Sequence, residues 1–208
     1  YQAFLNGPLA GYGDFNPHYV PIGIFGYDPN APVYDKKDYA KAEALFREAG
    51  YWDKGFTVSV ITEEGNLFAL MCLVLKDSIE RLNPKFRVNV LAVAESVFDD
   101  AHASNPLEYA MWAKNADPAA DPNFYLNAYA HPDGEWGEAH GFANGYKDAD
   151  RIASLIDRAA VELDSAKRAA LYSELQEVLY DDPMWIIGAQ EGVVMAHRSW
   201  LKGFAMQP

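Results

Sequence analysis

The stretch from residue 56 to 113 alternates short apolar runs with longer amphipathic ones, and this order constrains the fold more than any other feature of the chain. A period of two, typical of strands, occurs in FTVSVIT (56–62), FRVNVLAV (86–93) and LEYAMWA (107–113). The pattern between them predicts an amphipathic helix over 67–82 and a short helix over 95–103. Strands joined by helices imply parallel pairing and right-handed crossovers. The sequence therefore predicts an α/β fold, a mixed sheet with a parallel β-α-β-α-β core flanked by helices.

The flanking regions predict further elements around this core. Apolar residues recur at helical spacing over 38–49, 121–128, 148–163 and 165–181. Two apolar runs predict strands near the end of the chain, MWIIGAQ (184–190) and VVMAHR (193–198). The opening segment, residues 1–35, is rich in proline and glycine. We expect it to run extended over a surface and to form neither helix nor strand.

Charge and cysteine content exclude several classes of protein. The chain has 208 residues, 50% of them hydrophobic, and a formal net charge of -13. A protein this acidic repels phosphate backbones, so we expect no binding to nucleic acid. The single cysteine, Cys72, lies within a predicted helix and is expected to be a small core residue. No apolar run approaches the ~20 residues that a membrane-spanning helix needs.

The polar turn after the third predicted strand is the strongest candidate for a recognition site. In open α/β sheets, ligands bind outside the carboxyl ends of strands. At this end the sequence delivers Trp112, Asn115 and Asp117. Tyr109 and Met111, on the strand itself, complete the predicted ligand-binding set. For Trp112 and Asp117, a structural role and a ligand role both stay open.

Asp121 follows the same turn and has a simpler interpretation. It precedes Pro122, and an acidic residue followed by proline at the first helical position is typical of a helix start. Capping is therefore favoured for Asp121 over ligand binding. The alternative is an acid/base pair of carboxylates in a hydrolase, formed by Asp117 with Asp121 or by Asp99 with Asp100.

Signatures of catalysis and of metal binding are scarce. The sequence has no glycine-rich phosphate loop, no H-E-x-x-H, no nucleophile elbow and no paired CxxC. Imidazole and carboxylate groups that suit zinc or manganese gather in one stretch, at His131, Asp133, Glu135, Glu138 and His140. Their spacing matches no metal-site template, so neither a metal nor a cofactor is predicted.

Motifs in a fixed order carry a resemblance that spans nearly the whole chain. Late in the chain they are Asn144-Gly145-Tyr146, Asp150, Ala159, Asp164, Arg168, Leu171-Tyr172, Gln176, Asp182-Pro183 and RSWLKGF at 198–204. Upstream they are DYAKAEALFREAGY at 38–51 and MWAKNADPAADPNFYL at 111–126. Together they resemble the carboxyl-terminal lobe of the family 5 extracellular solute-binding proteins, the oligopeptide, dipeptide and nickel binding proteins of ABC importers.

The resemblance implies an exported receptor, periplasmic or extracellular, with two lobes that close over a solute and deliver it to the permease subunits of an ABC transporter. It implies no enzymatic activity. By that comparison the chain is one lobe of a type II periplasmic-binding-protein-like fold, cut from a longer protein. Residues 1–35 would be an extended inter-lobe segment, 36–197 the ligand-binding lobe, and 198–208 the crossing back to the other lobe.

One position departs from the pattern of the family. Members that bind peptides commonly have an aspartate three residues after the tryptophan, where it meets the amino group of the ligand; here that residue is Asn115, and Asp117 follows. A carboxylate pairs with an ammonium group, whereas an amide only forms hydrogen bonds. The solute is thus a peptide, a sugar, an opine-like compound or another small molecule. The alternative function is a carboxylate- or metal-dependent hydrolase.

Overall fold

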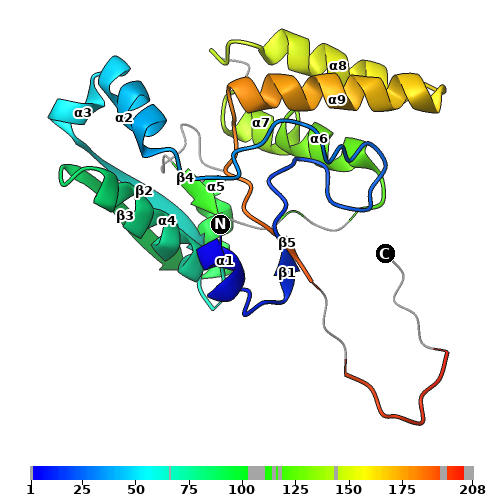
Figure 1. Cartoon of the computed structure of the whole chain (residues 1–208), viewed down its shortest axis with the longest axis horizontal. Coiled ribbons are helices and arrows are strands. Elements are labelled where there is room, and N and C mark those ends of the chain that lie inside the picture. Colours follow the sequence, from blue (N-terminus) through cyan, green and yellow to red (C-terminus); the bar gives the residue numbers. More distant parts are fainter. Residues whose placement is uncertain are drawn as a thin grey trace.

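A parallel sheet and a layer of helices lie beside one another and make up most of the fold (Figure 1). The structure is a computed structural model that describes residues 2–65, 67–102, 111–113, 116, 119–142, 145–192 and 196–203. For His102 and Trp112 it describes the backbone alone. Most elements of both parts are ones that the sequence predicts, but the short helix at Glu135–Ala139 is not among them.

The predicted parallel core is confirmed. The elements of this core are β2 (Phe56–Glu63), α4 (Phe68–Leu82), β3 (Phe86–Val93), α5 (Glu95–His102) and β4 (Met111–Ala113). The strands lie in the order β3-β2-β4, and β2 is parallel to both neighbours. β2 pairs with β3 along its whole length, from Phe56 opposite Phe86 to Glu63 opposite Val93.

The two crossover helices cover opposite faces of the sheet. Successive residues of a strand point to opposite faces. Val60 packs in one core cluster with Cys72 of α4, whereas Ile61 packs in another with Phe98 of α5. Right-handed crossovers require this arrangement because α4 leads from the central strand β2 to the edge strand β3, whereas α5 leads in the opposite direction, from β3 past β2 to β4. Burial raises the pKa of the Cys72 thiol to about 11, and its predicted place in the core is confirmed.

Helix α2 (Tyr39–Glu48) begins and ends where the sequence predicts. The short α3 (Tyr51–Lys54), which the sequence did not predict, follows it. Asp38 caps α2, accepting a hydrogen bond of 2.9 Å from the backbone N–H of Lys41. Gly50, with a φ of 75°, ends it, because a left-handed residue cannot continue a helix. The ring of Phe46 stacks on that of Phe56 and so holds α2 against the start of β2.

The second half of the chain forms a layer of helices with its own hydrophobic core. Its helices are α6 (Pro122–Tyr129), α7 (Glu135–Ala139), α8 (Ala149–Val161) and α9 (Ser165–Asp181). α8 and α9 lie side by side, and α6 packs against α8 (Figure 1). Leu126, Ile156 and Leu175 are among the buried residues of their shared core. Among the described residues, no helix is both long and apolar enough to cross a bilayer.

The helix predicted over 148–163 ends earlier than expected. Asp164 caps α9 by accepting two backbone N–H hydrogen bonds of 3.0 Å each. Since a cap residue lies outside regular helix, α8 ends at Val161 and leaves Leu163 97% exposed. The prediction that Leu163 lies on the apolar face of this helix is therefore wrong.

The opening segment belongs to the core of the helical layer. Val20 is fully buried there, and Tyr19, Ile24 and Tyr27 pack against the same cluster. The prediction of a segment that only runs over a surface is wrong, because its aliphatic and aromatic side chains bury apolar area against the helices. The segment also contains two short elements that the sequence did not predict, α1 (Gln2–Asn6) and β1 (Gly13–Asp14).

The strand predicted over 184–190 is wrong except at its end. Only β5 (Gln190–Glu191) forms, and it pairs antiparallel with β1. Individual side-chain contacts take the place of a strand ladder: the side chain of Gln190 bonds to the backbone of Ile22, and the indole N–H of Trp185 donates to the carbonyl of Tyr129 at 2.6 Å. Of the strand predicted over 193–198, residues 193–195 lie outside the described residues, and 196–198 form no strand.

Trp136 of α7 joins the sheet to the helical layer. Its indole is 1% exposed and lies in one cluster with Ile61 and Phe98, while the rings of Tyr129 and Trp185 pack around it. α7 reaches this position by a very close approach to the preceding loop.

Two glycines permit that approach. A Cβ atom at Gly134 would lie 1.8 Å from the carbonyl oxygen of Asn127, and one at Gly137 would lie 1.9 Å from that of His131. No other residue fits at such distances. The position of Trp136 therefore depends on the absence of a side chain at Gly134 and Gly137.

Replacement of Gly137 by alanine is expected to lower the free energy of unfolding by about 3 kcal/mol, the upper range for overpacking a dense interior. The methyl group would have to displace the carbonyl of His131. Gly188→Ala is the matched control, because its Cβ would meet only the ring of Phe4 at an ordinary 3.4 Å. Chemical denaturation measures both variants, and equal stabilities would contradict the close packing of α7.

Candidate functional site

The carboxyl ends of the parallel strands form the edge at which open α/β sheets bind ligands. At this edge Glu63 of β2 lies opposite Val93 of β3, and Ala113 of β4 lies opposite Thr62 of β2. The N–H of Glu64 donates to the carbonyl of Val93 at 2.7 Å. The hydrogen bonds between β2 and β3 therefore continue to the ends of both strands. We refer to Glu63, Val93 and Ala113 as the carboxyl edge.

Thr62 holds the end of β4 to β2. Its side chain is fully buried, and its hydroxyl donates a hydrogen bond of 3.1 Å to the carbonyl of Ala113. A buried hydroxyl without a partner costs free energy, so this bond also satisfies Thr62 itself. Ala113 is the last strand residue before the predicted recognition turn. The end of β4 is therefore fixed by a side chain of the central strand.

Tyr125 of α6 holds Ala119 in place through two hydrogen bonds. The Tyr125 hydroxyl accepts from the N–H of Ala119 at 2.7 Å and donates to the carbonyl of the same residue at 3.0 Å. The tyrosine is 7% exposed. Ala119 lies outside any helix or strand. Its backbone N–H and its carbonyl are thus both satisfied by a single buried side chain.

Asp121 confirms its predicted role as the cap of α6, since its carboxylate accepts from the N–H of Asn123 at 2.8 Å. Both carboxylate oxygens also lie 3.1 Å from Nη2 of Arg168 in α9. Nε of Arg168 donates to the carbonyl of Ala159 at 2.9 Å, and its guanidinium lies over the ring of Phe25. Arg168 therefore ties the start of α6 to α8, α9 and the opening segment.

Of the five residues predicted to bind a ligand, the structure describes Met111 in full and Trp112 by its backbone alone. Met111 lies half-buried in β4 and packs against the core between the sheet and α4. The backbone of Trp112 lies in β4, paired with β2. Tyr109, Asn115 and Asp117 lie outside the described residues. The observed contacts of Met111 are those of a core residue, and ligand binding by the set stays a prediction.

The histidine and carboxylate stretch at 131–140 serves packing and local bonding. Nδ1 of His131 accepts from the N–H of Asp133 at 3.1 Å, and its Nε2 lies 3.6 Å from the carboxylate of Asp157. The ring of His140 stacks on Trp136, 5.9 Å between centroids. Within the described part of the chain, no group of three or more His, Cys, Asp or Glu side chains is placed to hold a metal ion.

A hollow of about 400 Å³ lies near the carboxyl edge, lined by Pro8, Leu9, Ala10, Tyr12, Leu67, Glu191 and Gly192. Leu67 precedes α4, shortly after the end of β2, and Glu191 belongs to β5. Ala10 has a φ of 48°, the only positive value among described residues other than glycine. Such strain is frequent at binding sites. Four of the lining residues, Ala10, Tyr12, Glu191 and Gly192, are exposed, so this hollow is open to solvent.

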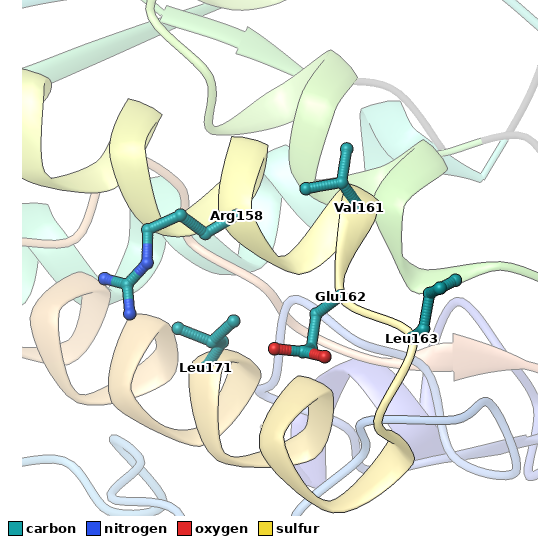
Figure 2. Close-up of a pocket in the computed structure, with 5 residues that line it drawn as sticks. All are labelled: Arg158, Val161, Glu162, Leu163 and Leu171. Atoms are coloured by element: carbon teal, nitrogen blue, oxygen red, sulfur yellow. The ribbon is translucent and has the colours of Figure 1, made fainter.

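A second hollow, of about 390 Å³, lies at the corner between α8 and α9. Figure 2 shows Leu171 between Arg158 and Glu162, with Val161 and Leu163 beside the end of α8. Val161 is 76% and Leu163 97% exposed, so these side chains do not enclose it. This corner lies at the far end of the helical layer from the sheet (Figure 1). The carboxyl edge is the better candidate site, because open α/β sheets bind ligands at that edge.

Sequence reasoning missed Thr62, Tyr125 and Arg168 as residues that shape the site. The signal for Thr62 is a polar residue on the face of the strand that otherwise carries Phe56, Val58 and Val60, next to the edge where ligands bind. Arg168 and Tyr125 form contacts with residues distant in sequence or in an irregular segment. No periodicity predicts such contacts.

Comparison with known proteins agrees with a binding role. Residues 1–136 match the model of the family described as "Bacterial extracellular solute-binding proteins, family 5 Middle". The structure of HbpA2 from Haemophilus parasuis is similar with a TM-score of 0.74 and 20% identity, over 91% of this chain and 37% of that one. This likeness confirms the predicted fold class.

Two curated relatives align with the whole of this chain. "Probable D,D-dipeptide-binding periplasmic protein DdpA" from Escherichia coli (strain K12) is 23% identical over 208 residues, which are 100% of this chain and 39% of that protein. "Glutathione-binding protein GsiB" from Salmonella typhimurium is 25% identical over 217 residues, 100% of this chain and 40% of that protein. The chain thus spans less than half the length of the curated relatives it matches.

Replacement of Thr62 by valine tests the upstream end of the turn. We expect the free energy of unfolding to fall by about 1–2 kcal/mol, because the bond to the carbonyl of Ala113 is lost in a buried place. Thr57→Val, at an exposed position of the same strand, is the control and should change stability by less than about 0.5 kcal/mol. Urea denaturation distinguishes the two. A Thr62 variant as stable as the control would show that this bond does not hold β4.

Proposed function

This chain belongs to the bacterial extracellular solute-binding proteins of family 5, and from that premise we propose that it captures a small solute outside the cytoplasm for delivery to a membrane permease. Its part of the receptor binds the solute and carries out no chemistry. The hydrolase alternative gains no support, since the family and the curated relatives are described as binding proteins.

One observation carries the proposed site: the segment 114–118, which follows β4, is bounded by two anchored residues, the first of them at the edge where α/β sheets bind ligands. Thr62 bonds to Ala113 at its start, and Tyr125 bonds to Ala119 at its end. We propose that Trp112, Asn115 and Asp117 from this turn contact the solute, with Tyr109 and Met111 as neighbours on the strand. An indole supplies apolar contact, and the amide and carboxylate supply hydrogen bonds.

We further propose that the receptor is exported and acts with the permease subunits of an ABC importer. Curated relatives are described as periplasmic or as binding a small peptide-like solute. A net charge of -13 is compatible with a receptor for uncharged or cationic solutes and disfavours polyanions.

The solute class proposed for this chain is a short peptide or a compound of similar size. The two relatives above are named for a D,D-dipeptide and for glutathione. Both compounds carry an ammonium group, which a carboxylate binds more strongly than an amide does. Because Asn115 is an amide, we propose that Asp117 provides the charged contact.

Substitution of Asp117 by asparagine in the full-length protein is expected to weaken solute binding by about 1.5–3 kcal/mol, the range for hydrogen bonds to charged groups. Thermal stability should barely change if the group meets solute and not backbone. Titration calorimetry with glutathione and D-alanyl-D-alanine measures affinity, and a thermal melt measures stability.

Asp121→Asn is the matched control in the same turn. Asparagine caps a helix about as well as aspartate, and the partly exposed pair with Arg168 contributes at most about 1 kcal/mol to stability. Equal losses of affinity at the two aspartates would refute the charged contact. So would an Asp117 variant that melts earlier but binds normally.

A further inference from the structure

The opening segment is held on α9 by polar contacts as well as by apolar ones. Nε2 of Gln176 in α9 donates to the carbonyl of Gly26 at 3.3 Å. Further along the segment, the hydroxyl of Ser173 donates to the carboxylate of Asp28 at 3.2 Å. The attachment of this segment therefore depends on the protonation and hydrogen bonding of a few side chains.

His18 lies buried at this contact. It is 9% exposed, and its ring meets the ring of Tyr27 edge to face, 5.1 Å between centroids. From α9, the neutral side chain of Gln176 lies against it. Within the described part of the chain, the charged group that acts on the ring is the carboxylate of Asp28, from the opening segment itself.

The backbone of His18 is tied to β5 by two amide side chains. Its N–H donates to Oδ1 of Asn16 at 3.3 Å, and Nδ2 of Asn16 donates to Oε1 of Gln190 at 3.2 Å. The same Oε1 accepts from the N–H of Ile22 at 2.8 Å. Asn16 is only 3% exposed, so these bonds form away from water. His18 thus stands between α9 and the pair of β1 with β5.

The neutral form of His18 is the one that suits this place. Burial lowers the pKa of its imidazole, and the carboxylate of Asp28 and the contact with Gln176 oppose that shift only in part. A proton added to the docked ring would place a charge away from water, which costs free energy. Detachment of the segment returns the ring to water and removes this cost.

The direction of the pH effect follows from the lowered pKa. The detached segment binds more protons than the docked one at any pH near or below the ordinary histidine value of about 6.5. The attachment is therefore strongest above that pH, and it weakens as the pH falls through it.

We propose that His18 is an acid-sensitive latch, which holds the opening segment against α9 and β5 near neutral pH and releases it in acid. Protonation of a buried histidine is a local change of charge, and the docked and detached segment is the two-state element that it biases. The inference goes beyond the proposed function and does not rest on it, because it concerns how one segment is held. In an exported receptor, the pH of the surroundings would control this latch.

The test measures hydrogen exchange in segment 15–28 of the full-length protein without solute, at about pH 7.5 and about pH 5, corrected for the intrinsic effect of pH on exchange. Protection of this segment should fall by about threefold to thirtyfold. Thirtyfold is about the limit for a histidine of ordinary pKa that stays neutral when docked. The strands β2 and β3, which belong to the sheet, are the internal reference and should keep their protection.

His18→Gln removes the titrating ring and keeps a side chain that forms hydrogen bonds. In this variant, protection of segment 15–28 should change by less than about twofold between the two pH values, even if it is lower than in the wild type at both. His197→Gln is the matched control, because His197 is exposed. Its protection should fall in acid as it does in the wild type.

Asp28→Asn tests the charge beside the ring. The carboxylate favours a proton on His18, so its removal should make the fall in protection at least as large as in the wild type. A smaller fall would contradict the role given to His18.

Three other outcomes would overturn the inference. They are an equal fall in the wild type and in His18→Gln, a wild type whose segment 15–28 keeps its protection in acid, and a loss of equal size in β2 and β3. The last result would show that acid opens the whole fold and not the latch. None of these outcomes bears on the proposed function, because no solute is present.

Discussion

The close contact between α7 and the loop before it is the constraint on which the two parts of the molecule depend. With a side chain at Gly137, the backbone could not approach the carbonyl of His131 as it does. Trp136 would then lose its place between Ile61 and the ring of Trp185. Because a buried indole removes a large apolar area from water, this one contact couples the sheet to the helical layer.

That coupling matters for function because the candidate site draws on both parts. The parallel sheet supplies the carboxyl edge and holds Ala113 through Thr62. The helical layer holds Ala119 through Tyr125, and the start of α6 through the pair of Asp121 with Arg168. A site built this way keeps its shape only if sheet and helices hold a fixed relation, which the Trp136 cluster provides. Because the chain belongs to a family of solute-binding proteins, we interpret this geometry as that of a binding site.

The sequence predicted the elements whose apolar pattern is regular. It did not predict features that depend on individual contacts, such as the end of a helix or the burial of one side chain. Period-two alternation predicted β2 and β3, and helical spacing predicted α9, since both patterns follow from the geometry of a buried face. Leu163 was assigned to a helix that the cap Asp164 ends sooner. Val20 lies in a proline-rich segment with no period, so its burial could not be read from a pattern. For the site, the Asp121 cap was predicted, whereas Tyr125 and Arg168 act through contacts that depend on the tertiary fold.

Hydrogen exchange over the full-length protein, with and without saturating solute, tests the central claim most directly. If the solute binds at the carboxyl edge, protection on binding should appear in 62–67 and 111–121 and be absent from the α8–α9 corner, 158–171. Slower exchange in solvent-exposed amides follows from burial and hydrogen bonding under a ligand. Protection confined to the corner, with none along the edge of the sheet, would contradict the account.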